Sequence, residues 1–288
     1  MKNRLNPLND FLFLKVMGEK GDEEQLCAFL NAVLGRNGQN AVESVEIIEN
    51  KTITAEVVGD KSSILDARAR TAAGERVNIE VQLRNLGNMD RRSLFYWSRE
   101  FSRGMEAGQD YRETAKVIAI NIVNYEFQPE VAAFHLSFHI WEDKHREVLL
   151  TDALEIHFLD MVKFRRTGER DIRGEPLQRW LTWFDRGSSE ALVEEVIKMD
   201  AGIRKAEEKM ANVSGDKEAL RAYQMREMAL SDWTSGINHA REEGMREGLQ
   251  AGKREGMQEI AVKMKKRGVS AGQIAEDTGL SVEDIAKL

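Results

Sequence analysis

The chain has 288 residues, of which 42% are hydrophobic and 32% charged, and its formal net charge is −7. This length suffices for one full hydrophobic core with appended segments, and the composition is that of a globular protein. An acidic chain lacks the overall basic field of many nucleic-acid-binding proteins, so any contact with DNA must come from a local patch.

Cysteine usage and hydropathy argue against a disulfide-stabilised protein and against a membrane-spanning one. Cys27 is the single cysteine, so an intrachain disulfide is impossible, which is consistent with a reducing compartment. The best apolar run, residues 117–123, is too short to span a membrane. The N-terminal residues lack the apolar segment of a secretory signal. We therefore expect a cytoplasmic protein.

The first elements are predicted to be helical. Apolar residues follow helical spacing over residues 11–34, with an interruption between Gly18 and Asp22. This pattern predicts one or two helices that end at Gly35. Residues 42–58 are then typical of a pair of strands or of one long irregular strand.

The next segment predicts a β-hairpin. Residues 76–83 alternate strictly between polar and apolar side chains, a period of two that predicts a half-buried strand. The run 64–70 precedes it as the partner strand. A three-residue loop that ends at Gly74 is a favoured connection, because glycine adopts the left-handed conformation there. In the register that this loop imposes, Asp66 lies directly opposite Glu80.

Two opposed carboxylates suggest a metal site. Directly opposed residues have Cβ atoms about 4.5–5.5 Å apart, where like charges repel each other. Such a pair usually shares a cation or a proton, and oxygen ligands suit a hard divalent ion such as Mg²⁺. The alternative is that Asp66 and Glu80 are solvated on an open sheet face. Three nearby arginines would then balance them, namely Arg68, Arg70 and Arg76.

Further elements extend the predicted sheet. Residues 89–106 have the spacing of a helix, and the continuous apolar run 116–123 predicts a strand that is covered on both faces. Residues 134–140 alternate again and direct His135 and His139 to one face. On a strand these histidines lie about 13 Å apart and cannot share a metal ion. His157, in an apolar segment, is expected to be a satisfied core or interface residue.

The remainder, from Pro176 onward, is predicted to be mostly helical. Trp180, Trp183 and Phe184 have the character of packing residues. Farther on, glycines recur at multiples of four residues within a charged segment, at positions 236, 244, 248, 252 and 256. Such a stripe allows two helix backbones to approach closely, so we expect this helix to pair with a second chain. The alternative is a frayed, weakly helical linker.

The last segment has the spacing of a helix-turn-helix, with Gly279 in the turn. Its second helix carries Glu283 and Asp284, and acids are unfavourable against phosphates. We interpret it as a degenerate helical hairpin. The expected segments are an N-terminal domain of helices and strands (1–165), a helical region (166–235), a glycine-periodic oligomerisation helix (236–267) and this hairpin (268–288).

The hairpin and its flanking segments resemble a known family. Asp66 followed by Glu80-Val81-Gln82 is similar to the signature of PD-(D/E)XK nucleases, in which an Asp and a Glu-x-Lys on neighbouring strands bind the metal. Other segments resemble the Rpn family of recombination-promoting nucleases, often labelled PD-(D/E)XK nuclease family transposases. These are residues 9–15, 29–34, 91–98, 111, 117–122, 149–159, 205–206 and 223–227. The resemblance implies an α/β fold with a restriction-endonuclease-like core and a helical C-terminal region.

The resemblance also implies a function, a divalent-metal-dependent DNA endonuclease. Mg²⁺, or Mn²⁺ or Ca²⁺ in its place, would be held by Asp66, Glu80 and the Val81 carbonyl, and Gln82 would position the attacking water. Gln82 replaces the lysine of the superfamily, so this residue can hydrogen-bond a water but carries no charge.

The sequence leaves alternatives for the remaining site residues. A further acid from the N-terminal helices, Glu24 or Asp10, would complete the metal site. Arg91 and Arg92 would neutralise DNA phosphates, or else they simply begin a solvated helix. A second hypothesis is a catalytically weak or inactive nuclease fold that acts as an interaction or regulatory module. The acidic net charge and the missing lysine favour this alternative.

Overall fold

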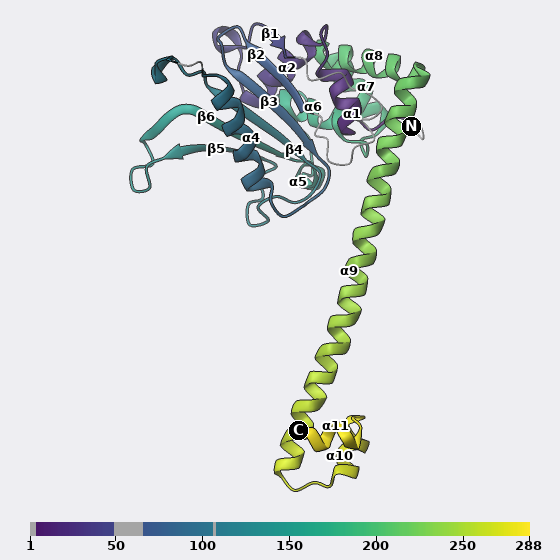
Figure 1. Ribbon diagram of the computed structural model, residues 1–288. Coiled ribbons are helices and arrows are strands. Elements are labelled where there is room, and N and C mark those ends of the chain that lie inside the picture. Colours follow the sequence, from purple (N-terminus) through teal and green to yellow (C-terminus); the bar gives the residue numbers. More distant parts are fainter. Residues whose placement is uncertain (1–3, 49–65, 106–107) are drawn as a thin grey trace. The chain divides into compact units, whose positions relative to one another are not determined.

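The computed structural model describes residues 4–48, 66–105 and 108–288 (Figure 1). The chain divides into two compact units, Met1–Glu227 and Met228–Leu288, which are described separately.

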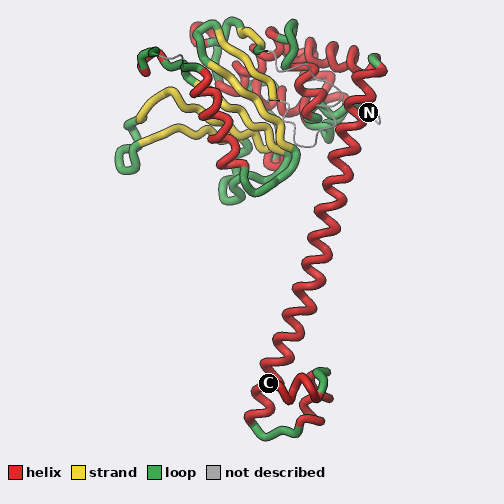
Figure 2. Tube along the Cα trace, in the orientation of Figure 1, coloured by secondary structure: helices red, strands yellow, loops and turns green. Residues whose placement is uncertain are grey.

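The first unit is built on a six-stranded mixed sheet, drawn in yellow in Figure 2. The strand order is β1-β2-β3-β4-β6-β5. The β3–β4 and β4–β6 pairs are parallel and the others antiparallel. The strands are β1 (Val45–Ile47), β2 (Asp66–Thr71), β3 (Arg76–Gln82), β4 (Val117–Val123), β5 (His135–Trp141) and β6 (Leu149–Asp160).

Two helices precede the sheet, as predicted. They are α1 (Asp10–Met17) and α2 (Glu23–Leu34), and the break between them falls in the expected segment. The Asn9 side chain accepts a hydrogen bond from the Leu12 amide and so caps α1. Gly35, with a φ of 62°, ends α2 in the left-handed conformation.

The predicted hairpin is confirmed in its register. Asp66 pairs with Glu80 across β2 and β3, and the Thr71 amide donates to the Glu75 carbonyl at 2.9 Å. Gly74 has a φ of 85°, which is the left-handed conformation that the loop requires. Residues 49–65, which include parts of the predicted strands 42–58 and 64–70, lie outside the described residues.

The expectation that β3 is half-buried was wrong. Arg76, Asn78 and Glu80 on its polar face are all 8% exposed or less. The reason is α4 (Met89–Arg103), which packs over this face of the sheet (Figure 1). The Trp97 indole on α4 donates to the Val117 carbonyl at 3.0 Å. The alternating pattern therefore identified the strand correctly, but it could not show that a helix covers the polar face with ion pairs.

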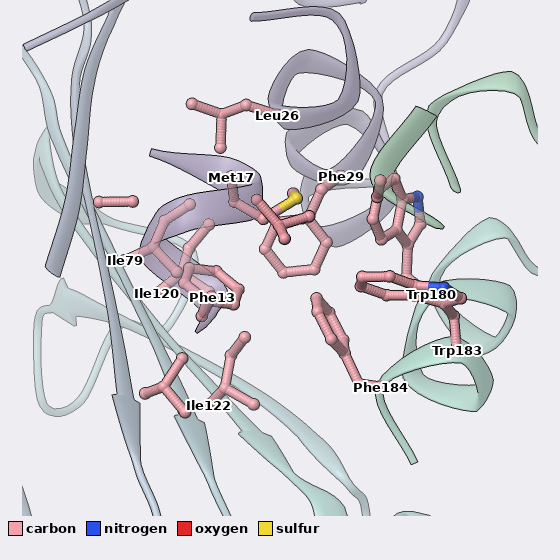
Figure 3. Close-up of a cluster of buried hydrophobic side chains, with 14 of the residues drawn as sticks. Phe13, Met17, Leu26, Phe29, Ile79, Ile120, Ile122, Trp180, Trp183 and Phe184 are labelled. Atoms are coloured by element: carbon pink, nitrogen blue, oxygen red, sulfur yellow. The ribbon is translucent and has the colours of Figure 1, made fainter. Parts of the chain in front are cut away.

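The opposite face of the sheet carries the main hydrophobic core. Isoleucines of β3 and β4 meet aromatic residues from the helices, including Phe13, Phe29, Trp180 and Phe184 (Figure 3). The Phe29 ring contacts Trp180 and Phe184 at centroid distances of 5.4 and 5.5 Å. The predicted packing role of Trp180, Trp183 and Phe184 is confirmed, since each is at most 1% exposed.

Four helices of the first unit follow the last strand. They are α5 (Met161–Arg166), α6 (Pro176–Phe184), α7 (Glu190–Met199) and α8 (Ala201–Gly215). Two short 3₁₀ turns, η1 (Gly38–Asn40) and η2 (Tyr111–Glu113), lie in loops. The continuous apolar run of β4 is buried along its whole length, as expected for a strand covered on both faces.

The second unit consists of helices. The long helix α9 (Lys217–Lys266) continues into it from the first unit. Helices α10 (Ala271–Thr278) and α11 (Val282–Lys287) follow, with Gly279 at a φ of 70° between them. A small core of Ala261, Ile274 and Ile285 joins this hairpin to α9. No helix among the described residues is long and apolar enough to cross a membrane.

Candidate active site

The candidate site is centred on the opposed positions 66 and 80. Asp66 is the first residue of β2 and Glu80 lies near the end of β3, where their backbones pair directly. Glu80 in turn pairs with Asn121 of the parallel strand β4. The structure describes Asp66 only through this strand pairing. Glu80 lies on the sheet face that α4 covers.

Glu80 is sealed and ion-paired. Its side chain is 2% exposed, and its Oε1 lies 2.7 Å from Nη2 of Arg92 on the first turn of α4. The Arg92 guanidinium also lies over the Tyr96 ring, 5.4 Å from the centroid. Arg92 therefore serves as the counter-ion of Glu80, whereas its neighbour Arg91 is exposed.

Two residues beside Glu80 were missed in the sequence. Burial, and then the Glu80 carboxylate, raise the pKa of Tyr125. Its hydroxyl is buried, as is the side-chain oxygen of Asn78, and neither has a hydrogen-bond partner within the described part of the chain. Asn78 could have been identified from its parity with Glu80 on β3. Tyr125 follows a strand in an irregular loop, and no periodic signal marks it.

A second charge cluster fixes α4 to the sheet. Glu100 accepts from Arg68 at 2.9 Å, from Arg76 at 3.2 Å and from Arg103 at 2.6 Å. Burial opposes ionisation of Glu100, but the hydrogen bonds from these arginines outweigh it and lower its pKa. Arg68 and Arg76, which the sequence offered as counter-ions for the carboxylate pair, are therefore engaged by Glu100.

The other expected site residues are placed as follows. The Gln82 amide, half-buried at the end of β3, donates to the Arg84 carbonyl at 3.0 Å. The Val81 side chain packs in the core on the opposite face. The Asp10 carboxylate accepts from Nε of Arg226 at 2.9 Å and from its Nη2 at 2.5 Å. Glu24 pairs with Lys205.

The two acids of the N-terminal helices thus already have cationic partners. Their helices α1 and α2 pack on the apolar face of the sheet, whereas Glu80 lies under α4. Glu24 has a side chain that is 58% exposed. Asp10, at the start of α1, is the more enclosed of the two, with 16% exposure.

A separate polar chain links β5 and β6 and ends at Lys116, directly before β4. The Nε2 atom of His135 lies 2.9 Å from Nδ1 of His157, and Nε2 of His157 lies 2.8 Å from Glu155. Lys116 completes the chain by pairing with Glu155. His157 is therefore a satisfied core residue, as expected. Its partner His135 could not be recognised in the sequence, because the pairing depends on the β5–β6 register.

The donor chemistry of the site fits a hard divalent cation. The register brings the carboxylate positions 66 and 80 together, and the Val81 carbonyl is adjacent to Glu80. Among the described side chains, no three His, Cys, Asp or Glu residues gather to hold a metal ion. The candidate ligand set therefore depends on the Asp66–Glu80 pair, and a cation there must compete with Arg92 for Glu80.

Comparison with known proteins places this arrangement in a family. A family model described as PD-(D/E)XK nuclease family transposase matches residues 7–240, which include the sheet, α4 and the helices α5 to α8. No curated protein and no solved structure matches the chain. The matched span includes β2 and β3, which carry the opposed positions 66 and 80. The chain belongs to the PD-(D/E)XK nuclease family transposases.

Proposed function

We propose that this protein is a divalent-metal-dependent DNA endonuclease of the recombination-promoting type, which hydrolyses phosphodiester bonds. The observation that carries the proposal is the direct pairing of Asp66 with Glu80 within the family's core. Two carboxylates at adjacent positions repel each other unless a cation neutralises them. In a nuclease site, the cation that neutralises the two carboxylates would be the catalytic metal ion.

In this proposal Asp66, Glu80 and the Val81 carbonyl hold Mg²⁺, with Mn²⁺ or Ca²⁺ as alternatives. The ion would polarise the scissile phosphate and lower the pKa of an attacking water. Gln82 would orient that water, because its side-chain amide can both donate and accept a hydrogen bond. Asp10 or Glu24 would add an acid only after exchanging its present cationic partner.

Arg92 has a defined part in the same scheme. Its guanidinium neutralises the Glu80 carboxylate. A cation held by Glu80 would compete with this guanidinium, which would then contact a DNA phosphate, since arginine binds phosphate and carboxylate with the same planar geometry. Arg92 therefore links metal binding to substrate binding.

A plasmid-nicking assay with Mg²⁺ or Mn²⁺ tests the proposal. We expect wild-type protein to nick the plasmid and Asp66→Ala to be inactive. Asp152→Ala is the matched control, because Asp152 is exposed on β6 and should retain full activity. Cleavage by Asp66→Ala at the wild-type rate, in protein free of host nuclease, would rule out the assigned site.

One observation favours a second candidate function, an interaction or regulatory module on an inactive nuclease fold. Glu80 is almost completely buried against Arg92, and the superfamily lysine is Gln82. In that case Mn²⁺ would not bind the wild-type protein more tightly than Glu80→Gln. Titration calorimetry on the two proteins distinguishes the candidates without reference to cleavage.

We further propose that the protein is cytoplasmic and self-associates through its glycine-periodic segment. The proposal includes the division of the chain into four segments, residues 1–165, 166–235, 236–267 and 268–288, of which the third mediates self-association. Within the described residues, nothing lies within 4 Å of the Cβ position at Gly244, Gly248 and Gly252 of α9. The charges over residues 241–288 balance, with nine Lys or Arg and nine Asp or Glu. Complementary charges can stabilise a pair of helices, whereas a segment without net charge gains little from attraction to DNA phosphates. Truncation before Gly236 should lower the molar mass in light scattering, and an unchanged mass would favour the linker alternative.

A further inference from the structure

The outer surface of α4 carries a row of alternating cationic and aromatic side chains. Arg91, Phe95 and Arg99 follow one another at intervals of four residues and are all exposed. Residues at this spacing are neighbours on a helix surface, so the three side chains form a continuous row. Eight residues at 1.5 Å each give the row a length of about 12 Å.

This row is not used to hold the fold together. Phe95 is 57% exposed and the adjacent Leu94 is 50% exposed. No carboxylate in the described part of the chain pairs with Arg91 or Arg99. The Arg99 guanidinium instead lies over the Phe95 ring, 5.8 Å from its centroid. The two cations are therefore available to an anionic partner, in a chain whose net charge is −7.

The position of the row connects it with the candidate site. Arg91 is adjacent in sequence to Arg92, whose guanidinium pairs with Glu80 at 2.7 Å. The inner side of the same helix is fixed to the sheet by Trp97 and Glu100. The row is consequently held on a rigid helix whose first turn covers the candidate catalytic carboxylate.

The chemistry of the row favours one kind of occupant. Alternating guanidinium and aromatic groups suit single-stranded nucleic acid, because phosphates pair with arginine and every unstacked base can stack on a ring. Bases in an intact duplex are already stacked and cannot reach Phe95. A row of about 12 Å spans only a few nucleotides of an unstacked strand, which is more extended than a strand in a duplex.

We propose that the Arg91–Phe95–Arg99 row binds an unpaired stretch of the DNA strand next to the Glu80 site. This inference rests on the proposed nuclease function and specifies its substrate. Arg91 and Arg99 contact phosphates and Phe95 stacks on a base. The preferred substrate is then DNA with a single-stranded or locally opened segment, not a fully paired duplex.

Fluorescence anisotropy with full-length protein in EDTA tests the inference, because no cleavage then occurs. The probes are a labelled strand of about 20 nucleotides, which exceeds the length of the row, and the corresponding duplex. We expect wild type to bind the single strand more tightly. Phe95→Ala should lose roughly tenfold in affinity for the single strand, since base stacking contributes about 1–3 kcal/mol. Its salt dependence should not change.

The arginines are tested by Arg91→Glu/Arg99→Glu. We expect a loss of at least about tenfold for the single strand, and a salt slope that is smaller by about 1.4 because two phosphate contacts are removed. Arg204→Glu/Arg221→Glu is the matched control, since both residues are exposed on the helices α8 and α9. This control should remain within roughly twofold of wild type, because distant exposed charges are screened by salt.

Several outcomes would overturn the inference. Phe95→Ala with wild-type affinity, equal loss in the control, or equal binding of duplex and single strand would each reject it. A change in molar mass in the row variants, without a change in DNA affinity, would make the row a protein interface. If Asp66→Ala abolishes nicking while the row variants bind normally, the row is rejected and the nuclease function stands. If instead the row variants lose affinity for the single strand while Asp66→Ala still nicks at the wild-type rate, only the catalytic assignment is rejected.

Discussion

The two faces of the sheet are closed in different ways. On one face, aromatic rings from α1, α2 and α6 pack against the isoleucines of β3 and β4. On the other face, α4 lies over β3, β4 and β6, and it is held there by the Arg92–Glu80 pair, the Glu100 cluster and a smaller apolar cluster that includes Met89. Apolar burial is the main favourable term in folding, whereas buried ion pairs contribute little net stability. The face with the larger apolar core therefore contributes more to the stability of the fold, and the face under α4 holds the groups that are suited to chemistry.

The largest effect is expected from Glu80→Gln, which separates activity from stability. Loss of the carboxylate should reduce divalent-dependent nicking to background, because a neutral amide is a poor ligand for a hard cation. The free energy of unfolding should fall by about 1–2 kcal/mol, less than the cost of breaking a fully buried pair, since Arg92, with a side chain 21% exposed, can turn to water. Plasmid nicking and urea denaturation measure the two quantities. A large loss of stability would contradict the division between the two faces.

Phe29→Ala tests the apolar face. Phe29 is fully buried between Trp180 and Phe184, so we expect a loss of about 3–5 kcal/mol in the free energy of unfolding. Phe95→Ala is the matched control, because the same truncation at an exposed position should cost less than about 0.5 kcal/mol. Urea denaturation of the three proteins gives the comparison. Equal losses in the two variants would show that burial does not set the difference.

Glu100→Gln tests the charge cluster of the polar face. The substitution leaves Arg68 and Arg76, with side chains 16% and 9% exposed, without their anionic partner. Breaking a buried pair costs about 3–5 kcal/mol, and partial exposure of these arginines reduces our expectation to about 2–3 kcal/mol. Glu113→Gln, an exposed glutamate, is the control and should be neutral. A loss below about 0.5 kcal/mol would mean that α4 does not depend on the cluster.

The sequence predicted the local elements well, but it predicted poorly the contacts between segments that are distant along the chain. The break between α1 and α2 and the Asp66–Glu80 register follow from spacing and loop geometry, which are local properties. The packing of α4 over β3 does not follow from local properties, because the alternating pattern of β3 contains no information about what covers its polar face. The same holds for the Arg92–Glu80 pair, whose partners belong to different elements.

The candidate site was therefore predictable only in part. Its carboxylate positions are encoded within one hairpin. Tyr125 and Asn78, whose buried polar atoms lack partners within the described residues, acquire their environment only through the tertiary fold. The exposed row on α4 was also hidden, because four-residue spacing of Arg91, Phe95 and Arg99 has meaning only once the opposite side of the helix is known to face the sheet.

The smallest expected effect concerns the polar chain at β5 and β6, and it extends the comparison to pH. Burial, and then the neighbouring His157, lower the pKa of His135 to about 4, whereas a histidine in the unfolded chain titrates near 6.5. Between these values the unfolded state binds more protons, so stability falls as the pH falls from about 6.5 to 4. Burial raises the pKa of Glu155, but hydrogen bonds from His157 and Lys116 outweigh this and lower it to about 2. Its contribution is lost only below its unfolded pKa of about 4.3.

A comparison of pH 7 with pH 5 isolates His135, since Glu155 remains ionised at both. Burial raises the pKa of Asp22 to about 6, which changes stability in the opposite direction on acidification, but this change is common to wild type and variant. Wild type should therefore lose about 1 kcal/mol more than His135→Leu between pH 7 and pH 5, a value discounted because the ring is only half-buried. His139→Leu, on the same strand, should follow wild type. Urea denaturation at the two pH values measures these losses. Equal losses in wild type and His135→Leu would show that protonation of His135 is not coupled to unfolding.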